Sequence, residues 1–218
     1  MPLFELKNAK AAYDGEVVLS DISLSIERGE RVAFVGQSGA GKSTLLSLLY
    51  EQNGVDSALV PQDLGLVQAL SVFHNVYMAH LHEHNAFYNL VNLIKPLRRE
   101  VDAVLPIITR LGLDDKLFTP VGELSGGQQQ RTAVGRAIYK RCSTFFGDEP
   151  VSAVDEHQSR AVLESIVDGH ETVLLSMHDV ALALAYSDRV VGLKKGRIVL
   201  DQPTDGMKPS DLYDLYID

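Results

Sequence analysis

One nine-residue stretch, Gly36 to Thr44, limits the folds open to this chain more than any other. It reads GQSGAGKST and stands between an apolar segment, RVAFV, and a helix-forming segment, STLLSLLYEQ. Its spacing fits G-x-x-x-x-G-K-[ST], in which glycines let successive backbone N–H groups turn inward around an anion and the next helix adds its positive end. The stretch therefore predicts a strand, a phosphate-binding loop and a helix in that order. The alternative is a glycine turn that only connects the strand to the helix.

Polar side chains of this loop complete a predicted nucleotide site. Lys42 can reach the terminal phosphates of a nucleotide, and the hydroxyl of Ser43 can bind Mg²⁺. We therefore expect a nucleoside triphosphate with Mg²⁺ as the ligand. The loop residues expected to bind it are Gly36, Ser38, Gly39, Gly41, Lys42, Ser43 and Thr44.

A second apolar segment, STFFGDEP, supplies two acids. A magnesium-bound triphosphate needs a further oxygen ligand, which P-loop proteins place at the end of another buried strand. Asp148 ends such a predicted strand, Glu149 follows it and Pro150 stops it. We expect Asp148 to bind Mg²⁺ and Glu149 to orient or deprotonate the attacking water, a role that depends first on position. The alternative is a solvated acidic turn.

The stretch LSGGQQQ, Leu124 to Gln130, looks like a second phosphate-binding turn, but it has no lysine and lies 83 positions from Lys42 (125 minus 42). Ser125 can cap a helix that starts near Gly127, and the glycine pair lets backbone N–H groups approach a phosphate. In a two-fold dimer, such an incomplete site can meet the nucleotide that the other copy holds. The alternative is a well-capped helix and nothing more. The residues expected to contact the partner's nucleotide are Ser125, Gly126, Gly127 and Gln128.

Length and composition fit one globular domain. The chain has 218 residues, of which 45% are hydrophobic and 22% charged, as in ordinary soluble proteins. Its net charge of -9 argues against a general nucleic-acid-binding role. No uncharged apolar run approaches the roughly 18 residues that cross a bilayer, so we expect a cytoplasmic chain. The single cysteine, Cys142, excludes an intramolecular disulfide and is expected in the core.

Apolar strands that alternate with helices predict an α/β fold with a parallel sheet covered on both faces. From about Leu70 to Leu113 the pattern is helical, with Pro106 expected to kink or restart a helix, and we interpret this part as an inserted helical subdomain. The predicted strands are 4–13, 17–27, 31–36, 57–62, 143–148, 172–177 and a hairpin over 189–201. The predicted helices are 43–52, 71–84, 95–113, 128–141, 156–167, 180–187 and 210–217.

Together these motifs resemble the ATPase subunit of an ABC transporter over essentially the whole chain. GQSGAGKST is similar to the family's Walker A motif, FFGDEP to Walker B with its catalytic glutamate, and LSGGQQQ to the family signature. The resemblance implies one ABC ATPase domain over residues 1–218. This domain would have a P-loop NTPase core with a mostly parallel sheet, an N-terminal antiparallel β subdomain and a helical signature subdomain at about 70–135.

The same resemblance implies cofactors and partners. ATP and Mg²⁺ are the implied cofactors, and a homodimer is expected to form on ATP binding. The other implied partners are integral membrane permease subunits and a separate substrate-binding protein, with no nucleic acid. The chain is expected to lie at the cytoplasmic face of the inner membrane as a peripheral subunit.

Four further residues receive roles from the resemblance alone. Tyr13 matches the aromatic residue that stacks on adenine, with a buried strand tyrosine as the alternative. Gln62, in LVPQD, matches a glutamine that senses Mg²⁺ and touches the membrane partner, so we expect it to act as both a metal and a catalytic residue. Asp155, in SAVD, matches a loop that crosses the dimer interface, where the family usually has leucine in place of Val154. His178, in LLSMHD, matches a switch histidine that contacts the terminal phosphate and helps to position the water.

One segment departs from the family pattern. Only 20 positions separate Lys42 from Gln62, whereas members of the family usually have a longer segment that holds an antiparallel hairpin. The hairpin must therefore be trimmed or missing here, which affects an edge of the sheet and not the phosphate chemistry.

Within the family, the helical insert and the tail of this chain look most like those of phosphonate-type importers. The expected cargo is therefore a phosphonate or a similar small anionic solute. One alternative is an ABC ATPase that acts in cell division or lipoprotein release. Another is a nucleotide-gated binding module with negligible turnover, against which Glu149 and His178 argue.

Two polar clusters are open to more than one interpretation. His80, His82 and His84, in HLHEH, could suggest zinc, but only two of them share a helical face and no third ligand follows, so we expect a polar helix face. Three basic residues could face a partner or lipid headgroups, but a solvated face is the favoured interpretation. They are Lys95, Arg98 and Arg99.

Overall fold

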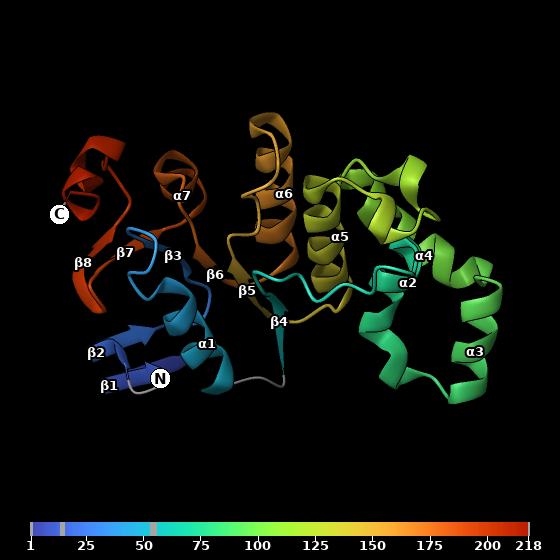
Figure 1. Ribbon diagram of the computed structural model, residues 1–218, viewed down its shortest axis with the longest axis horizontal. Helices are drawn as coiled ribbons and strands as arrows, with labels where there is room; N and C mark the ends of the chain where they lie inside the picture. The colour runs from blue at the N-terminus through green and yellow to red at the C-terminus, as the bar shows by residue number, and fades with distance from the viewer. Residues whose placement is uncertain (1, 14–15, 53–55, 218) are drawn as a thin grey trace. The chain divides into compact units, whose positions relative to one another are not determined.

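A computed structural model describes residues 2–13, 16–52 and 56–217. The chain divides into two compact units, each with its own hydrophobic core. The sheet unit contains residues 1–59, 143–149 and 170–218, and the helical unit contains residues 60–142 and 150–169 (Figure 1).

A six-stranded sheet forms the centre of the sheet unit, in the order β4-β5-β6-β3-β7-β8. β3 (Arg31–Val35) is parallel to β6 (Thr172–Ser176) on one side and to β7 (Arg189–Lys194) on the other. β5 (Thr144–Asp148) is parallel to β6. All residues of β5 and β6 are buried, which is what their apolar sequences predict for strands covered on both faces.

The edges and faces of this sheet are completed by four elements. Figure 1 shows two helices on opposite sides of it, α1 (Lys42–Gln52) and α7 (Val180–Tyr186). The edge strands are β4 (Ser57–Val60) and β8 (Arg197–Pro203), and β8 is antiparallel to β7. The carboxyl ends of the parallel strands therefore lie along one edge of the sheet, where ligands bind in α/β proteins.

The N-terminal antiparallel sheet of the described residues has two strands, β1 (Phe4–Tyr13) and β2 (Glu16–Ile26). Their inward side chains, among them Phe4 and Leu19, share one core with α1 and β3. Only residues 53–56 separate the end of α1 from β4, too few for another pair of strands. The predicted trimming of the antiparallel hairpin is therefore confirmed.

Helices make up the other unit, and their apolar faces form its core around Phe73, Val104 and Ile108. The α-helices are α2 (Val72–Tyr77), α3 (Ala86–Ile94), α4 (Arg98–Arg110), α5 (Gly126–Tyr139) and α6 (Glu156–Gly169). Shorter 3₁₀ segments are η2 (Met78–Glu83), η3 (Asp114–Lys116) and η4 (Val121–Glu123). None of the helices in the described ranges is long and apolar enough to cross a membrane.

Two local predictions were wrong. The single helix expected over 71–84 is α2 followed by the 3₁₀ segment η2, and the closing helix is another 3₁₀ segment, η5 (Pro209–Leu215). α4 continues through Pro106, so the helix does not restart there, which was one of the two predicted outcomes. Pro106 is exposed, so water can serve the one carbonyl that loses its helical donor. Cys142 is buried, as predicted.

Candidate nucleotide site

The predicted phosphate-binding loop joins β3 to α1 and is packed tightly at both ends. Gly36 has a φ of 142°, and a Cβ there would lie 2.2 Å from the carbonyl oxygen of Leu193. Gly41 has a φ of 101°, and a Cβ there would lie 2.6 Å from the side chain of Leu19. Between and beyond these glycines the loop is accessible, because Ser38 and Gly39 are exposed and Thr44 is half-buried. This loop is thus fixed where it leaves the sheet and open where a phosphate would bind.

Lys42 begins α1 and turns back into the loop. Its Nζ donates to the carbonyl oxygens of Gly36, at 2.9 Å, and Gln37, at 3.0 Å. Burial lowers the pKa of the Lys42 ammonium, and the negative charges of Glu149 and Asp148 partly oppose that shift. The two carbonyls are neutral partners, so an anion in the loop would be a stronger partner for this charge.

Ser43 and Asp148 come together from elements far apart in the sequence. Asp148 ends β5, and its Oδ1 accepts a hydrogen bond of 3.0 Å from the Ser43 hydroxyl at the start of α1. Mg²⁺ prefers a few protein oxygens next to the phosphates of its nucleotide. These two oxygens, beside the phosphate loop, fit that preference.

Glu149 and His178 form an ion pair at the same edge of the sheet. Glu149 Oε1 lies 2.5 Å from His178 Nε2, and the histidine is more exposed, at 43% against 20% for the glutamate side chain. The backbone N–H of Glu149 donates to the carbonyl of Ser176 at the end of β6. This extends the β5–β6 pairing by one residue and aims the carboxylate toward the histidine that follows β6.

The backbone of Glu149 is unusual. Its φ is 54°, in the left-handed region, although it carries a side chain and precedes Pro150. Such a conformation costs about 1–2 kcal/mol for a residue other than glycine. Strain of this kind is held in place by surrounding structure and is frequent at functional sites. The sequence signals the acid at this position but not its conformation.

The helical unit carries the second glycine turn, at the start of α5. Ser125 caps this helix, with its Oγ accepting from the Gln128 N–H and its own N–H donating to Gln128 Oε1. The helix begins at Gly126, one residue earlier than predicted. A Cβ at Gly127 would lie 2.5 Å from the carbonyl oxygen of Ala153. Glycine is therefore required there, because the helix start is pressed against the loop that contains Ala153.

A buried glutamine joins α5 to that loop. Gln130 Nε2 donates to the hydroxyl of Ser152, and its Oε1 accepts from the N–H of Ala153 at 2.8 Å. Asp155, in the same loop, is exposed and caps α6 by accepting from the Gln158 N–H. The sequence does not single out Gln130, since a run of three glutamines gives no sign of which one is buried.

Two residues were assigned by resemblance alone, Tyr13 and Gln62. Tyr13 ends β1, and its side chain lies outside the part of the chain that the structure describes. Gln62 follows β4, belongs to the helical unit and is exposed. Their roles stay predictions.

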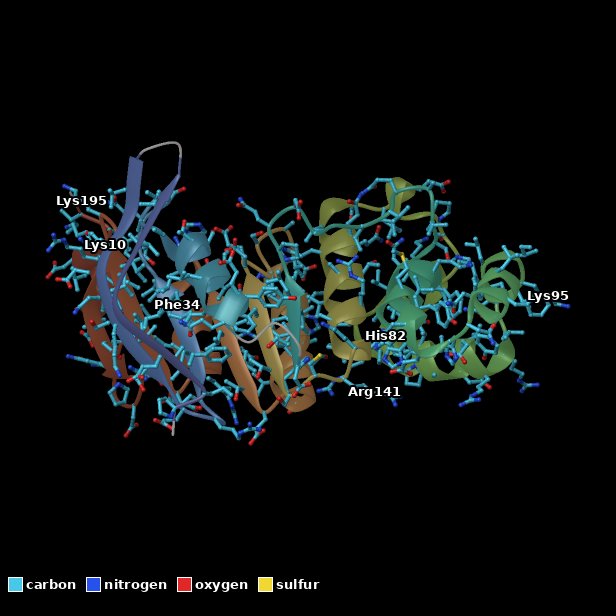
Figure 2. The ribbon with its side chains drawn as sticks, turned by 90° about the horizontal axis from the view of Figure 1, so that it is seen from below. Lys10, Phe34, His82, Lys95, Arg141 and Lys195 are labelled. Carbon is cyan, nitrogen blue, oxygen red and sulfur yellow. The ribbon has the colours of Figure 1, made fainter. Side chains whose placement is uncertain are left out.

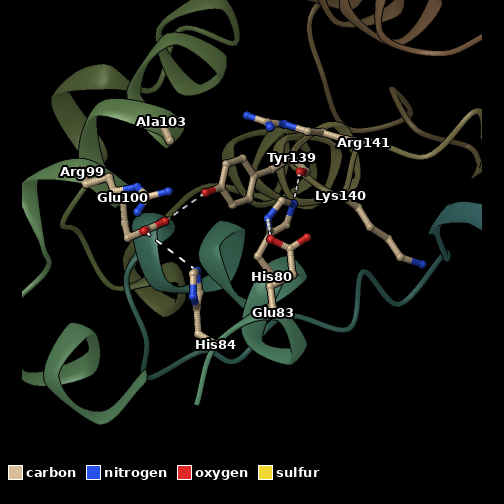
Figure 3. Close-up of a pocket in the computed structure, with 9 residues that line it drawn as sticks. All are labelled: His80, Glu83, His84, Arg99, Glu100, Ala103, Tyr139, Lys140 and Arg141. Atoms are coloured by element: carbon tan, nitrogen blue, oxygen red, sulfur yellow. Dashed lines mark hydrogen bonds and ion pairs between the residues drawn. The ribbon is translucent and has the colours of Figure 1, made fainter. Parts of the chain in front are cut away.

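Of the HLHEH histidines, His82 is exposed, as a polar helix face predicts, whereas His80 and His84 contact buried groups (Figure 3). His80 is buried, and its ring nitrogens lie 3.1 Å from Glu83 Oε2 and 2.6 Å from the carbonyl oxygen of Tyr139. His84 Nε2 lies 3.9 Å from the buried carboxylate of Glu100. Burial beside that carboxylate raises the pKa of Tyr139 to about 12. Within the described residues no group of three or more potential ligands could hold a metal ion.

The basic cluster faces solvent. Lys95 points away from the helices (Figure 2), and all three side chains are exposed. Arg98 pairs with Asp102 one turn along α4. This exposure agrees with a solvated face for Lys95, Arg98 and Arg99 and does not distinguish it from a face that meets a partner or lipid headgroups.

A mostly parallel sheet with a phosphate loop after β3, acids at the end of β5 and a helical unit with a capped glycine turn defines a P-loop ATPase of the cassette type. The sequence matches the ABC transporter family over residues 19–152. The chain belongs to this family, as the ATPase subunit that was predicted from its motifs.

Several relatives align over nearly the whole chain. The phosphonates import ATP-binding protein PhnC 1 of Halalkalibacterium halodurans is 31% identical over 98% of this chain and 94% of its own length. The protein of the same name from Pseudomonas syringae pv. tomato is 35% identical over 93% and 87%. The first alignment spans 244 positions, although 98% of the 218 residues is about 214. This chain therefore lacks about 30 aligned positions, in agreement with a trimmed segment.

Solved structures share the fold. The dimeric bacterial ABC transporter cassette MJ0796 has a TM-score of 0.79 and 23% identity, covering 94% of this chain and 100% of that one. A post-hydrolysis state of the same cassette, bound to ADP and phosphate, has a TM-score of 0.77 and the same identity. The predicted fold class is confirmed.

Proposed function

We propose that this chain hydrolyses ATP to drive an importer of phosphonate-type or similar small anions. One observation carries the hydrolytic part: Ser43, Asp148, Glu149 and His178 meet beside the phosphate loop, joined by two side-chain contacts. The names of relatives about one-third identical over almost the full length support the cargo. Both units together would form one ATPase domain, and α5, which follows the LSGG stretch, would be the signature helix of a helical subdomain at about 70–135.

The loop residues would hold the nucleotide. MgATP, when bound, supplies the phosphoanhydride bond and the positive charge that offsets its phosphates. Lys42 Nζ would leave the two loop carbonyls for the terminal phosphates. The oxygens of Ser43 and Asp148 would hold Mg²⁺, with Gln62 as a further ligand and Tyr13 against the adenine.

Glu149 and His178 would handle the water. A carboxylate one residue past the metal ligand is placed to accept a proton at Oε1 from the attacking water. His178 Nε2, already paired with that oxygen, would fix the direction of the carboxylate and contact the terminal phosphate. The left-handed backbone of Glu149 keeps this geometry in place before any nucleotide binds.

The second glycine turn, residues 125–128 at the start of α5, is called the signature turn below, and it would serve a second copy of the chain. Ser125 and the glycines after it present backbone N–H groups at a helix N-terminus, and the stretch LSGGQQQ contains no lysine or arginine, which suits a nucleotide held elsewhere. A two-fold dimer would bring each turn to the other copy's phosphate loop. Through Gln130, a shift of the signature helix would also move the loop that carries Asp155.

An apolar groove in the helical unit supports a membrane permease as a partner. The groove has a volume of about 470 Å³, and Leu81, Leu90 and Leu93 in its lining are 38%, 54% and 48% exposed. Phe87 and Ile94, on α3, are also exposed. Apolar surface of this kind marks a protein–protein interface. With such a partner, and a separate binding protein for the cargo, the chain would lie peripherally at the cytoplasmic face of the membrane.

Copurification tests this assignment. The tagged chain is isolated from gently solubilised membranes of its source cells with ATP present, alongside Leu90→Lys and, as a matched control on another surface, Val199→Lys. We expect a multi-span permease with the wild type and the control but not with Leu90→Lys. Recovery of a division or lipoprotein-release protein in place of a permease would overturn the importer assignment.

A further inference from the structure

The segment that follows β8 touches the phosphate loop directly. The N–H of Gly36 donates to the phenol oxygen of Tyr216 at 3.3 Å, and Gln37 Nε2 donates to the Tyr216 carbonyl at 2.8 Å. These contacts span 180 and 179 positions of sequence. The sequence does not mark Tyr216, because it belongs to no motif.

We propose that Tyr216 is a positioning residue for nucleotide binding, which holds the first two residues of the phosphate loop in the conformation that accepts phosphate. The proposal rests on the ATPase function above and adds to it a residue outside the family motifs. It depends on three features of the sheet unit. These are the anchoring of the tail to β7, the hydrogen bonds between Tyr216 and the loop, and the hydrogen bonds that Lys42 makes to the same two loop residues.

The tail is anchored to β7 firmly enough to act as a support. Leu212 and Leu215 are buried, and a Cβ at Gly192 would lie 2.8 Å from Leu215, so β7 needs glycine there to accept that leucine. Lys194 Nζ donates to the carbonyl oxygens of Asp214 and Ile217. Cationic side chains stabilise the free carbonyls at the end of a helical segment in this way.

Tyr216 holds the same two residues that Lys42 holds. The carbonyl oxygens of Gly36 and Gln37 accept from Lys42 Nζ inside the loop, whereas the Gly36 N–H and the Gln37 side chain bond to Tyr216 outside it. When Lys42 turns to a phosphate, the inner bonds are lost. The outer bonds to Tyr216 then remain to keep the loop entrance in place.

Tyr216 also lies close to the segment after β6. Burial raises the pKa of its phenol, the bond from Gly36 opposes this shift, and the negative charge of Asp179 adds to it. The phenol is thus neutral and able to accept from Gly36 at physiological pH. Asp179 directly follows His178, so this charge belongs to the segment of the predicted switch histidine.

The test compares Tyr216→Phe with Tyr213→Phe in the full chain. Tyr216→Phe removes only the phenol oxygen and keeps the backbone bond from Gln37. Tyr213 lies in η5, three residues before Tyr216, and is 63% exposed, so Tyr213→Phe controls for the loss of a phenol from this part of the tail. The measurements are the Kd for ATP, kcat at saturating ATP, and hydrogen exchange of the Gly36 amide without nucleotide.

We expect Tyr216→Phe to exchange the Gly36 amide faster and to raise the Kd for ATP roughly three- to tenfold, the size expected when one neutral hydrogen bond holds a binding-competent state. The kcat should stay within about twofold, since the catalytic groups are untouched. Tyr213→Phe should match the wild type in all three. An unchanged Kd in Tyr216→Phe, or a loss in kcat with an unchanged Kd, would overturn the proposal. If the wild type itself fails to bind ATP, the ATPase assignment fails instead.

Discussion

Two glycine turns in this chain each lead into a helix, yet they are built for different tasks. The phosphate loop contains a lysine held only by neutral carbonyls and lies beside Asp148 and Glu149. The signature turn has no lysine, and the first basic residue along α5, Arg131, is buried with its guanidinium donating to the carbonyls of Leu111, Gly112 and Gly127.

This difference explains why one chain needs both turns. A triphosphate requires a movable cation and a metal ligand as well as backbone N–H groups. The first turn supplies all three, and the second supplies only N–H groups at a helix N-terminus. The second turn is therefore suited to complete a site and not to form one.

Removing the cation should have the largest effect on the first turn. Lys42→Ala should weaken ATP binding at least roughly 100-fold, because hydrogen bonds to a charged group contribute about 1.5–3 kcal/mol each. Equilibrium binding of ATP checks this, with Lys7→Ala as a control at an exposed lysine of the same unit. Binding by Lys42→Ala within a few-fold of the wild type would remove the distinction between the two turns.

Neutralising the predicted base should separate binding from hydrolysis. Glu149→Gln should keep ATP affinity but lower kcat by about 10²- to 10⁴-fold, the usual contribution of a general base. With the reaction blocked, a dimer should accumulate in ATP and not in ADP, as measured by light scattering on a sizing column. Wild-type phosphate release by this variant would contradict the role given to Glu149.

Blocking the second turn should leave the first turn's own affinity intact. Ser125→Arg places a bulky side chain at the start of α5, so hydrolysis should fall at least roughly 100-fold, since electrostatic contacts that stabilise a reacting group contribute on that scale. The Kd for ATP of the single chain should stay within about twofold. Ser125→Ala controls for the lost helix cap, which costs about 1 kcal/mol of stability. A matching loss of hydrolysis in Ser125→Ala would assign the effect to the cap.

Loosening the signature helix from its neighbouring loop should have the smallest effect. Gln130→Leu leaves the Ala153 N–H without its side-chain acceptor and should lower the free energy of unfolding by about 1–3 kcal/mol. Hydrolysis should fall roughly tenfold. Gln129→Leu, which loses only a bond to the carbonyl of Leu124, should lose less in both thermal melts and phosphate release. Equal losses in the two variants would deny Gln130 a special role.

The sequence predicts the chemistry of the nucleotide site better than its geometry. The phosphate loop and the acids after β5 are fixed by residue type at a set spacing, so their chemistry could be predicted before their geometry was known. The Glu149–His178 pair joins positions 29 apart (178 minus 149) through the β5–β6 pairing. No local pattern encodes that register or the left-handed φ of Glu149.

Other features escaped prediction for related reasons. The segment η2 continues directly from α2 but has the tighter i→i+3 hydrogen bonds of a 3₁₀ helix, a difference that residue type does not reveal. Pro106 normally breaks a helix, but its exposed position in α4 removes most of that cost. Tyr216 reaches the phosphate loop through contacts across 180 positions, which depend on the whole sheet unit.

The most direct test of the account mixes two inactive variants. Ser125→Arg retains an intact phosphate loop, and Lys42→Ala retains an intact signature turn, so a mixed dimer contains one complete site if each site is shared between copies. The account predicts that phosphate release, absent from each variant alone, returns in the mixture and rises with the fraction of mixed dimer. No recovery, with mixed dimers present in ATP as verified by differently tagged chains, would contradict the shared site.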